Sequence, residues 1–254
     1  MFERELAFVH ETADRAAEIG LGFYRNGFEV MTKPDRSPVT EADLAIEAMV
    51  RERIADAFPG DAVLGEEQGG ADEGGRTWIL DPIDSTKNFA MGIQIWGTLL
   101  ALQVEGDLKV SVVSAPALGE RYAAVRGEGA SCNGEPIHVS AVGRIADAHV
   151  LYSGMKRWLR PPRNEAVLSV IAEGSRSRSF GDFWGHVLVA RGAAELMLEP
   201  ELNVWDYAAP QLITEEAGGR VTTMEGGPTV DGGSVLTTNG VLHDELVARF
   251  AARG

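Results

Sequence analysis

The stretch WILDPIDSTKNF, residues 78–89, constrains this chain more than any other feature. Its apolar start is typical of a buried strand, and Pro82 keeps the preceding residue extended and ends the strand there. Asp81 and Asp84 therefore emerge together at the carboxyl end of a strand, where open α/β sheets commonly place ligands. Two carboxylates this close repel each other unless a positive charge lies between them. The stretch predicts a cation site at the end of a buried strand.

The residues that follow, STKNFA, indicate a short helix whose amino terminus offers free backbone N–H groups to a phosphate. Helix capping is the alternative interpretation, because Asp84 or Ser85 can serve as an ordinary N-cap. Capping explains one acid, but it leaves Asp81 without a role. It also leaves further acids unexplained, namely Glu66 and Glu67 in LGEEQGG and Asp206 in NVWDYAAP.

The charge balance limits the partners of the chain. Its 254 residues carry a formal net charge of −15 at pH 7, which repels a nucleic-acid backbone and an anionic membrane surface. The amino terminus lacks the pattern of a secretory signal, and no apolar window is long enough to span a bilayer. The single cysteine, Cys132, allows no internal disulfide and no thiolate metal site. We expect a cytoplasmic protein that binds neither nucleic acid nor membrane.

Hydrophobic periodicity divides the chain into two halves. Helical spacing over residues 5–25 and 40–58 predicts two amphipathic helices, and β-rich runs from Thr77 to about Val139 predict a sheet of hairpins. After about Ile145, strand-like and helix-like runs alternate, which is typical of helices layered on a sheet. We expect an α+β half at 1–145, with a mainly antiparallel sheet and most candidate metal ligands, and an α/β half at 146–254. We expect the two halves to form one compact unit.

Four segments resemble the motifs of a known family. DPIDSTKNF resembles the motif D-P-(I/L)-D-(G/S)-T-x-N-(F/Y) of the inositol monophosphatase superfamily, and VWDYAAPQLITEEAGG, residues 204–219, is similar to its second motif. SPVTEAD and VLGEE match two shorter upstream elements in the right order, and ordered motifs are a stronger signal than one alone. The resemblance implies a layered αβαβα sandwich of the inositol monophosphatase and fructose-1,6-bisphosphatase type, an α+β or α/β fold. It also implies a homodimer.

The same resemblance implies a Mg²⁺-dependent phosphomonoesterase with two or three ions in each active site. All the implied ligands are oxygen atoms, which Mg²⁺ prefers. One ion is held by Glu66, Asp81 and the backbone carbonyl of Ile83, and a second by Asp81, Asp84 and Asp206. Asp81 then bridges the ions, which explains how the two aspartates of the opening stretch coexist.

The resemblance also implies the catalytic groups. Glu66 and Thr86 position the attacking water, and Asp43 accepts a hydrogen bond from the Thr86 hydroxyl. The backbone N–H groups of Ser85 and Thr86 bind the phosphate, and hydrolysis is direct, without a phosphoenzyme. A capping box with Thr40 is an alternative role for Asp43, and the two roles are compatible.

Two residues depart from the commonest family pattern. Ser85 stands where glycine is frequent, and a positive φ is unfavourable for a residue with a side chain. Pro210 falls inside the predicted helix that opens near Asp206. We expect Pro210 in the first turn, where its missing N–H is harmless, and we expect neither departure to disrupt the metal site.

The substrate is predicted from residues 179–206, SFGDFWGHVLVARGAAELMLEPELNVWD, which resemble bacterial histidinol-phosphate phosphatases of the superfamily more than its inositol enzymes. Histidinol phosphate carries an ammonium group and an imidazole, which suit carboxylates and aromatic rings. We expect Asp182 and Glu199 to pair with cationic nitrogen and Phe183 or Trp184 to stack on the ring. The predicted substrate-binding residues are Asp182, Phe183, Glu199 and Asp206.

The predicted reaction is therefore hydrolysis of histidinol phosphate to histidinol and phosphate, in histidine biosynthesis. An inositol-1-monophosphatase, or a promiscuous phosphatase of small esters, is the alternative within this class, since fold and metal site are shared across substrates. A non-catalytic metal- or phosphate-binding regulator is the alternative of another class. Thr86 and the complete acidic set argue against a regulator, because a pure binder needs no groups that activate water. For Asp182 a helix cap is an alternative role.

Overall fold

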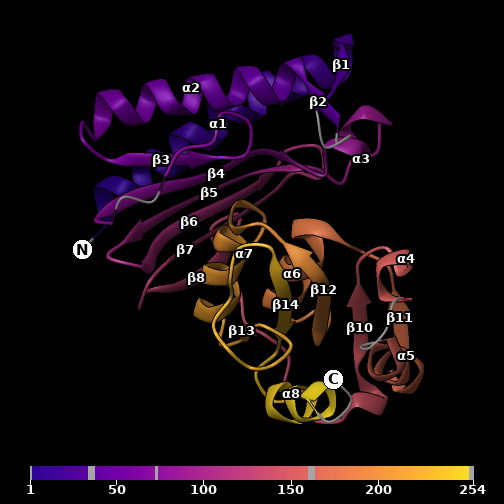
Figure 1. The fold of residues 1–254 in the computed structure, drawn as a ribbon. Helices are drawn as coiled ribbons and strands as arrows, with labels where there is room; N and C mark the ends of the chain where they lie inside the picture. The colour runs from indigo at the N-terminus through magenta and orange to yellow at the C-terminus, as the bar shows by residue number, and fades with distance from the viewer. Residues whose placement is uncertain (1, 34–37, 72–73, 160–163, 252–254) are drawn as a thin grey trace.

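Layers of helices and sheets alternate along one direction of the molecule (Figure 1). The computed structural model describes residues 2–33, 38–71, 74–159 and 164–251. The first layer holds two long helices, α1 (Glu3–Asn26) and α2 (Glu41–Ala57), with a two-stranded sheet of β1 (Val30–Thr32) and β2 (Pro38–Thr40) between them in the chain. None of the described helices combines the length and apolar character needed to cross a lipid bilayer.

A seven-stranded sheet in the described residues forms the second layer, with its strands in sequence order. Its strands are β3 (Ala62–Gly65), β4 (Arg76–Asp84), β5 (Gly97–Val104), β6 (Asp107–Ala115), β7 (Glu120–Val125), β8 (Gly129–Cys132) and β9 (Glu135–Pro136). Strands β4 to β9 pair antiparallel, as the hairpin pattern predicts, and only β3 runs parallel to its neighbour. The short helix α3 (Thr86–Ala90) follows β4.

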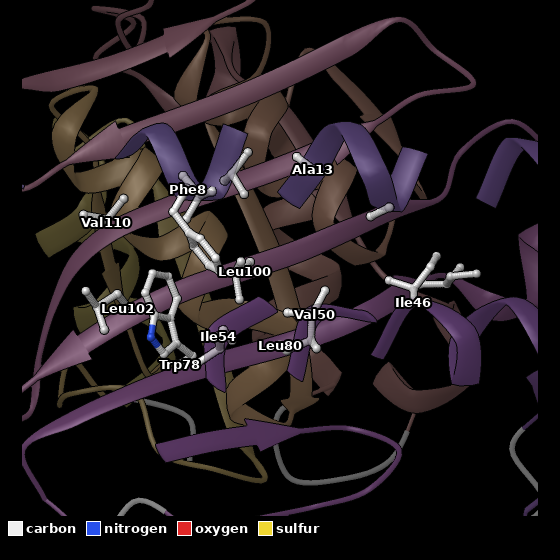
Figure 2. Close-up of a cluster of buried hydrophobic side chains, with 14 of the residues drawn as sticks. Phe8, Ala13, Ile46, Val50, Ile54, Trp78, Leu80, Leu100, Leu102 and Val110 are labelled. Atoms are coloured by element: carbon white, nitrogen blue, oxygen red, sulfur yellow. The ribbon is translucent and has the colours of Figure 1, made fainter. Parts of the chain in front are cut away.

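The core between the first two layers explains why these segments fold together. Every third or fourth residue of α1 is apolar, and this stripe, which includes Phe8 and Ala13, packs on the sheet. Figure 2 shows Phe8 beside Trp78 of β4, and their ring centroids lie 5.2 Å apart. The fully buried Trp78 donates its indole N–H to Asp61 at 2.9 Å, which satisfies the polar atom of this large ring.

The remaining layers come from the second half of the chain. Helices α6 (Asp182–Ala190) and α7 (Val204–Glu216) lie between the two sheets (Figure 1). The five-stranded sheet of the described residues has the order β11-β10-β12-β14-β13. Its strands are β10 (His149–Tyr152), β11 (Arg176–Arg178), β12 (Leu196–Leu202), β13 (Arg220–Thr222) and β14 (Gly233–Thr238).

Helices α5 (Asn164–Glu173) and α8 (His243–Ala251) cover the outer face of the five-stranded sheet. Two short elements, η1 (Ile145–Asp147) and α4 (Met155–Trp158), flank β10 in the chain. The order of layers is therefore helix, sheet, helix, sheet, helix. This confirms the αβαβα sandwich predicted from the sequence motifs, and it leaves α6 and α7 in contact with both sheets.

Candidate active site

A bulge in β4 brings Asp81 and Asp84 to the same face of the sheet. Asp81 pairs with Leu99 and Asp84 with Gly97, so three steps along β4 match two along β5. Side chains three positions apart in a regular strand point to opposite faces, and the additional residue restores a common face. The hydroxyl of Thr98 donates to the carbonyl of Pro82 at 2.8 Å inside the bulge. The prediction that Pro82 ends the strand is wrong, because β4 continues through the bulge to Asp84.

Asp206 reaches the two aspartates from the start of α7. Asn203 caps this helix, and the Asp206 carboxylate accepts a hydrogen bond from the Asn203 amide at 2.9 Å, which fixes the acid in the first turn. One carboxylate oxygen from each of Asp81, Asp84 and Asp206 lies within 4.8 Å of the other two. The fold therefore brings together three of the acids that the sequence predicts as metal ligands.

The electrostatics of this cluster favour a bound cation. Burial and the charges of Glu66 and Asp84 raise the pKa of Asp81 well above its ordinary value. Burial likewise raises the pKa of Asp84 strongly and that of Asp206 to about 7. One carboxylate oxygen of Asp81 is buried without a hydrogen-bond partner among the described residues, an arrangement that costs free energy unless a cation or proton binds there. A set of hard oxygen atoms of this kind suits Mg²⁺.

Glu66 lies just after β3, beside a cation that the sequence analysis missed. Lys33 donates to Glu66 at 2.8 Å and to Glu67 at 2.7 Å. Burial alone would lower the pKa of Lys33, but these two hydrogen bonds raise it above its ordinary value. Burial raises the pKa of Glu67 to about 7. Lys33 thus balances part of the negative charge at the site, and no sequence motif marked it.

A buried acid on α2, Glu47, holds the loop that carries Glu66. Its carboxylate accepts hydrogen bonds from the amides of Glu67 at 2.9 Å and Gln68 at 3.0 Å, and it pairs with Arg51 at 2.8 Å. A β-carbon on Gly65 would lie 2.4 Å from the Glu47 carboxylate, so this contact requires glycine. The sequence analysis missed Glu47 as well, although a glutamate on the apolar face of a predicted helix is a usable signal.

Thr86 and Asp43 lie within reach of each other, at the start of α3 and α2. The Thr86 hydroxyl is 3.1 Å from the Ile83 carbonyl and 3.4 Å from one Asp43 oxygen. The other Asp43 oxygen accepts hydrogen bonds from the amide and the hydroxyl of Thr40, which completes the capping box. Burial raises the pKa of Asp43 to about 6. The capping role is confirmed, and the catalytic role remains a prediction that this geometry permits.

Ser85 caps α3 with a left-handed backbone, at φ 68°. The unfavourable positive φ considered from the sequence is therefore present, and it turns the chain from the end of β4 into the helix. The amide groups of Ser85 and Thr86 lie at the start of this helix, directly after Asp84. The position of the predicted phosphate site is thus next to the acidic cluster.

The start of α6 meets the acidic cluster from the other side. Asp182 is exposed, whereas the ring of Phe183 is fully buried against the seven-stranded sheet. The prediction that Phe183 stacks on a ligand ring is therefore wrong, and its contribution is a backbone N–H that donates to Asp84 at 2.6 Å. Trp184, the other aromatic residue considered, is partly exposed beside Phe180, with ring centroids 4.9 Å apart.

Glu199 is buried behind Asp182. Its side chain is 2% exposed, and one carboxylate oxygen accepts from the Asp182 amide at 3.2 Å. Burial raises the pKa of Glu199 to about 8, and the charge of Asp182 adds to this increase. The structure therefore gives Glu199 a supporting contact to α6, while its predicted contact with substrate remains untested.

Two cavities meet at Asp182. The first, of about 260 Å³, is acidic and is lined by Asp84, Arg157, Asp182, Glu201, Leu202, Asn203 and Asp206. The second, of about 280 Å³, is lined by Asp182 and Trp184 together with Phe180, Ile93 and Ile95 and several small polar residues. Asp182 thus stands between a charged cavity and one of mixed character, which includes two aromatic and two aliphatic side chains.

Pro210 is the seventh residue of α7, so the prediction that it lies in the first turn is wrong. The helix starts at Val204 and is capped by Asn203, which is earlier than the start near Asp206 that the sequence predicts. Proline has no N–H, so the carbonyl of Asp206, four residues earlier, lacks its usual helical partner. The three-carboxylate cluster forms despite this irregularity.

Comparison with known proteins relates this geometry to a family. The profile of the inositol monophosphatase family matches residues 3–253. A histidinol-phosphatase of Mycobacterium tuberculosis is 43% identical, over 99% of this chain and 100% of its own length. A histidinol-phosphatase of Streptomyces coelicolor is 41% identical, over 98% of this chain and 97% of its own length. The solved inositol monophosphatase from Anabaena has a TM-score of 0.87 at 27% identity, and the match covers 100% of this chain and 97% of that one.

These matches extend along nearly the whole chain and agree with the layered fold. They define the class of the protein as a phosphoric monoester hydrolase. The chain belongs to the inositol monophosphatase family. The resemblance inferred from four sequence motifs, including the similarity to histidinol-phosphate phosphatases, is confirmed.

Proposed function

We propose that this protein is a Mg²⁺-dependent histidinol-phosphatase, which hydrolyses histidinol phosphate to histidinol and phosphate in histidine biosynthesis. The observation that carries the proposal is the cluster of Asp81, Asp84 and Asp206 within 4.8 Å, next to the start of α3 and to the exposed Asp182. The cluster suits a metal and a phosphate, and Asp182 suits a cationic leaving group. The histidinol-phosphatases of M. tuberculosis and S. coelicolor support the same substrate.

The metal ligands in this proposal are Glu66, Asp81 and the Ile83 carbonyl for one Mg²⁺ ion, and Asp81, Asp84 and Asp206 for a second. The unpartnered buried oxygen of Asp81 supports its role between the ions. Bound Mg²⁺ supplies positive charge for the phosphoryl oxygens and the leaving oxygen. A total of two or three ions in each site follows from the resemblance, and titration calorimetry with Mg²⁺ tests this number.

The residues around the metals position the attacking water and bind the phosphate. The Thr86 hydroxyl, oriented by Asp43 and the Ile83 carbonyl, accepts a hydrogen bond from the attacking water. Glu66 accepts a hydrogen bond from the other hydrogen of this water, so Thr86 and Glu66 together hold the nucleophile in place. The amides of Ser85 and Thr86 at the start of α3 bind the phosphate oxygens. No group of the chain forms a covalent bond with phosphorus in this scheme.

The leaving group extends from the acidic cavity past Asp182. The exposed carboxylate of Asp182 pairs with the ammonium group of histidinol, since this carboxylate borders both cavities. Trp184 and Phe180 offer ring faces to the imidazole in the second cavity. Glu199 supports Asp182 by accepting a hydrogen bond from the Asp182 amide.

We also propose that the enzyme is a homodimer of the cytoplasm. The family resemblance supports the dimer, and the single cysteine, Cys132, agrees with a reducing compartment. Light scattering coupled to size-exclusion chromatography tests the assembly, and a monomer at micromolar concentration contradicts it.

Phosphate release in the presence of Mg²⁺ tests the substrate. The assay compares kcat/KM for histidinol phosphate, inositol-1-phosphate and a 3′-phosphonucleotide, with EDTA as the metal-free control. We expect a preference for histidinol phosphate of about tenfold or more, because Asp182 forms a charge-assisted hydrogen bond with the ammonium group of histidinol and inositol offers no cation in its place. Equal rates with inositol-1-phosphate refute the substrate and retain the metal site. Unchanged rates in EDTA refute the metal site itself.

A further inference from the structure

Two of the four non-glycine residues with positive φ in the described chain lie at the active site. Glu105 and Asn133 precede Gly106 and Gly134 in tight hairpin turns, where such a backbone is expected. Ser85, at φ 68°, and Asp182, at φ 60°, lie outside hairpins and come from different halves of the chain. Left-handed backbone is unfavourable for residues with a β-carbon unless neighbouring contacts hold it.

These two residues hold each other. The Ser85 hydroxyl donates a hydrogen bond to a carboxylate oxygen of Asp182, across 97 positions of sequence. The neighbouring pair is also bonded, because the Phe183 amide donates to Asp84 at 2.6 Å. Asp84 and Ser85, at the end of β4, are thus hydrogen-bonded to two consecutive residues at the start of α6. Asp84 pairs with Phe183, and Ser85 pairs with Asp182. The end of β4 therefore fixes both the backbone of α6 and the orientation of the Asp182 side chain.

We propose that Ser85 is a positioning residue that orients Asp182 toward the leaving group and thereby sets substrate selectivity. This inference rests on the proposed function. An exposed aspartate samples several rotamers, and the hydroxyl selects one of them. A carboxylate has about four acceptor positions, so a single hydrogen bond from Ser85 leaves others for an ammonium group. The carboxylate held in this way is the one that borders both cavities.

The identity of residue 85 supports this role. A phosphate-binding turn with positive φ needs only a backbone amide, and glycine adopts this backbone without strain. Serine is less favourable there, and what it adds is the hydroxyl. In this structure the hydroxyl contacts Asp182. The side chain of Ser85 thus couples the phosphate-binding turn to the part of the site that selects the leaving group.

The test is a double-mutant cycle measured with two esters in the presence of Mg²⁺. The variants are Ser85→Ala, Asp182→Ala and the double variant, and the esters are histidinol phosphate and 4-nitrophenyl phosphate. We expect Ser85→Ala to lower kcat/KM for histidinol phosphate by about fivefold to tenfold, mainly through KM, and to change the aryl ester by less than about twofold. Asp182→Ala causes a larger loss of the same kind. The double variant equals Asp182→Ala alone, because Ser85 acts through Asp182.

Ser85→Gly separates the hydroxyl from backbone strain. It relaxes the positive φ, so we expect a higher Tm together with the same loss of selectivity as Ser85→Ala. Ser131→Ala is the matched control, because Ser131 is a partly buried serine on β8 at a distance in the sheet. This control keeps wild-type kinetics with both esters.

Two results overturn the inference. Equal losses on both esters in Ser85→Ala and Ser85→Gly mean that Ser85 acts on the phosphate. Additive losses in the double variant mean that Ser85 and Asp182 act independently. Failure of the proposed function has a different signature, because the wild-type enzyme then shows no preference for histidinol phosphate before any residue is changed. That result also removes the selectivity that Ser85 is proposed to set.

Discussion

The backbone amide of Phe183 lies 2.6 Å from a carboxylate oxygen of Asp84, although the two residues are 99 positions apart. This hydrogen bond joins the bulged end of β4 to the first turn of α6. A carboxylate oxygen of Asp84 also lies within 4.8 Å of carboxylate oxygens of Asp81 and Asp206. One side chain therefore contributes both to the packing of the two halves and to the acidic cluster, and a suitable substitution separates these contributions.

Asp84→Asn is expected to abolish turnover and leave the fold intact. The amide oxygen of asparagine still accepts from Phe183, but the ligand charge is lost, so we expect kcat to fall by at least about a thousandfold. Calorimetry should show weaker Mg²⁺ binding, and circular dichroism should be unchanged. Asp107→Asn, at the exposed start of β6, is the control. Near-normal turnover in Asp84→Asn would sink the two-metal assignment.

The three-carboxylate cluster is expected to destabilise the metal-free protein as the pH rises from about 4 to about 7. The folded-state pKa of Asp81, Asp84 and Asp206 is raised, to about 7 for Asp206, so the folded state binds more protons than the unfolded state over this interval. The free energy of unfolding then falls with pH, by an amount on the order of a few kcal/mol.

Urea unfolding in EDTA at several pH values measures this decrease. Saturating Mg²⁺ should remove most of it, because the metal binds the ionised carboxylates of the folded state and displaces their protons. The buried His186 and His243, whose pKa is lowered to about 4, act in the opposite direction in both conditions. A difference in stability between Mg²⁺-saturated and metal-free protein that does not grow across pH 4–7 would therefore show that the three acids are already compensated within the protein.

Gly65→Ala is expected to destabilise the protein and weaken Mg²⁺ binding. The new β-carbon lies 2.4 Å from the Glu47 carboxylate and 2.9 Å from Arg51, so the loop that carries Glu66 must move, at a cost of about 1–3 kcal/mol. Gly22→Ala is a matched control, since nothing lies within 4 Å of its β-carbon near the carboxyl end of α1. The control should gain about 0.5–1 kcal/mol from helix propensity. Equal Mg²⁺ affinity in both variants contradicts the role of Glu47 in placing Glu66.

Thr86→Val is expected to lower kcat by about a hundredfold or more and to change KM little. Valine keeps the shape of threonine but removes the hydroxyl that contacts Ile83 and Asp43, and loss of a group that orients the nucleophile acts on the chemical step. Single-turnover kinetics separates this effect from product release. Thr12→Val removes another buried hydroxyl, on α1, and should retain turnover. A Thr86→Val enzyme with normal kcat removes this residue from the proposed mechanism.

Much of the architecture was predictable because its signals are local. The helical spacing of residues 5–25 and 40–58 and the turn residues between the strands are read from neighbouring positions, and the elements lie close to the predicted bounds. The family motifs then gave the order of the layers. Local signals also identified Asp81, Asp84 and Asp206, since the first two lie at the end of a strand-like run and the third lies at the start of a predicted helix.

The errors arose where distant residues decide the local structure. The bulge at Pro82 depends on pairing with Thr98 and Gly97 of β5, so proline alone suggested that the strand ends. An aromatic residue beside an acid does not reveal which face is buried, and Phe183 packs into the core. Lys33 acts through contacts made only in the folded chain, and no motif marks it. Glu47 also acts through such contacts, and its only signal in the sequence is its place on the apolar face of a predicted helix.

The position of α7 between the two sheets has a consequence for biosynthesis. A ribosome produces Glu66, Asp81 and Asp84 more than a hundred residues before Asp206, so a nascent chain can form the first sheet while the acidic cluster is still incomplete. The third carboxylate arrives only when the second half docks. Hydrolytic activity therefore reports that the last helices have reached their places, and a premature stop codon before residue 206 yields a chain without this cluster.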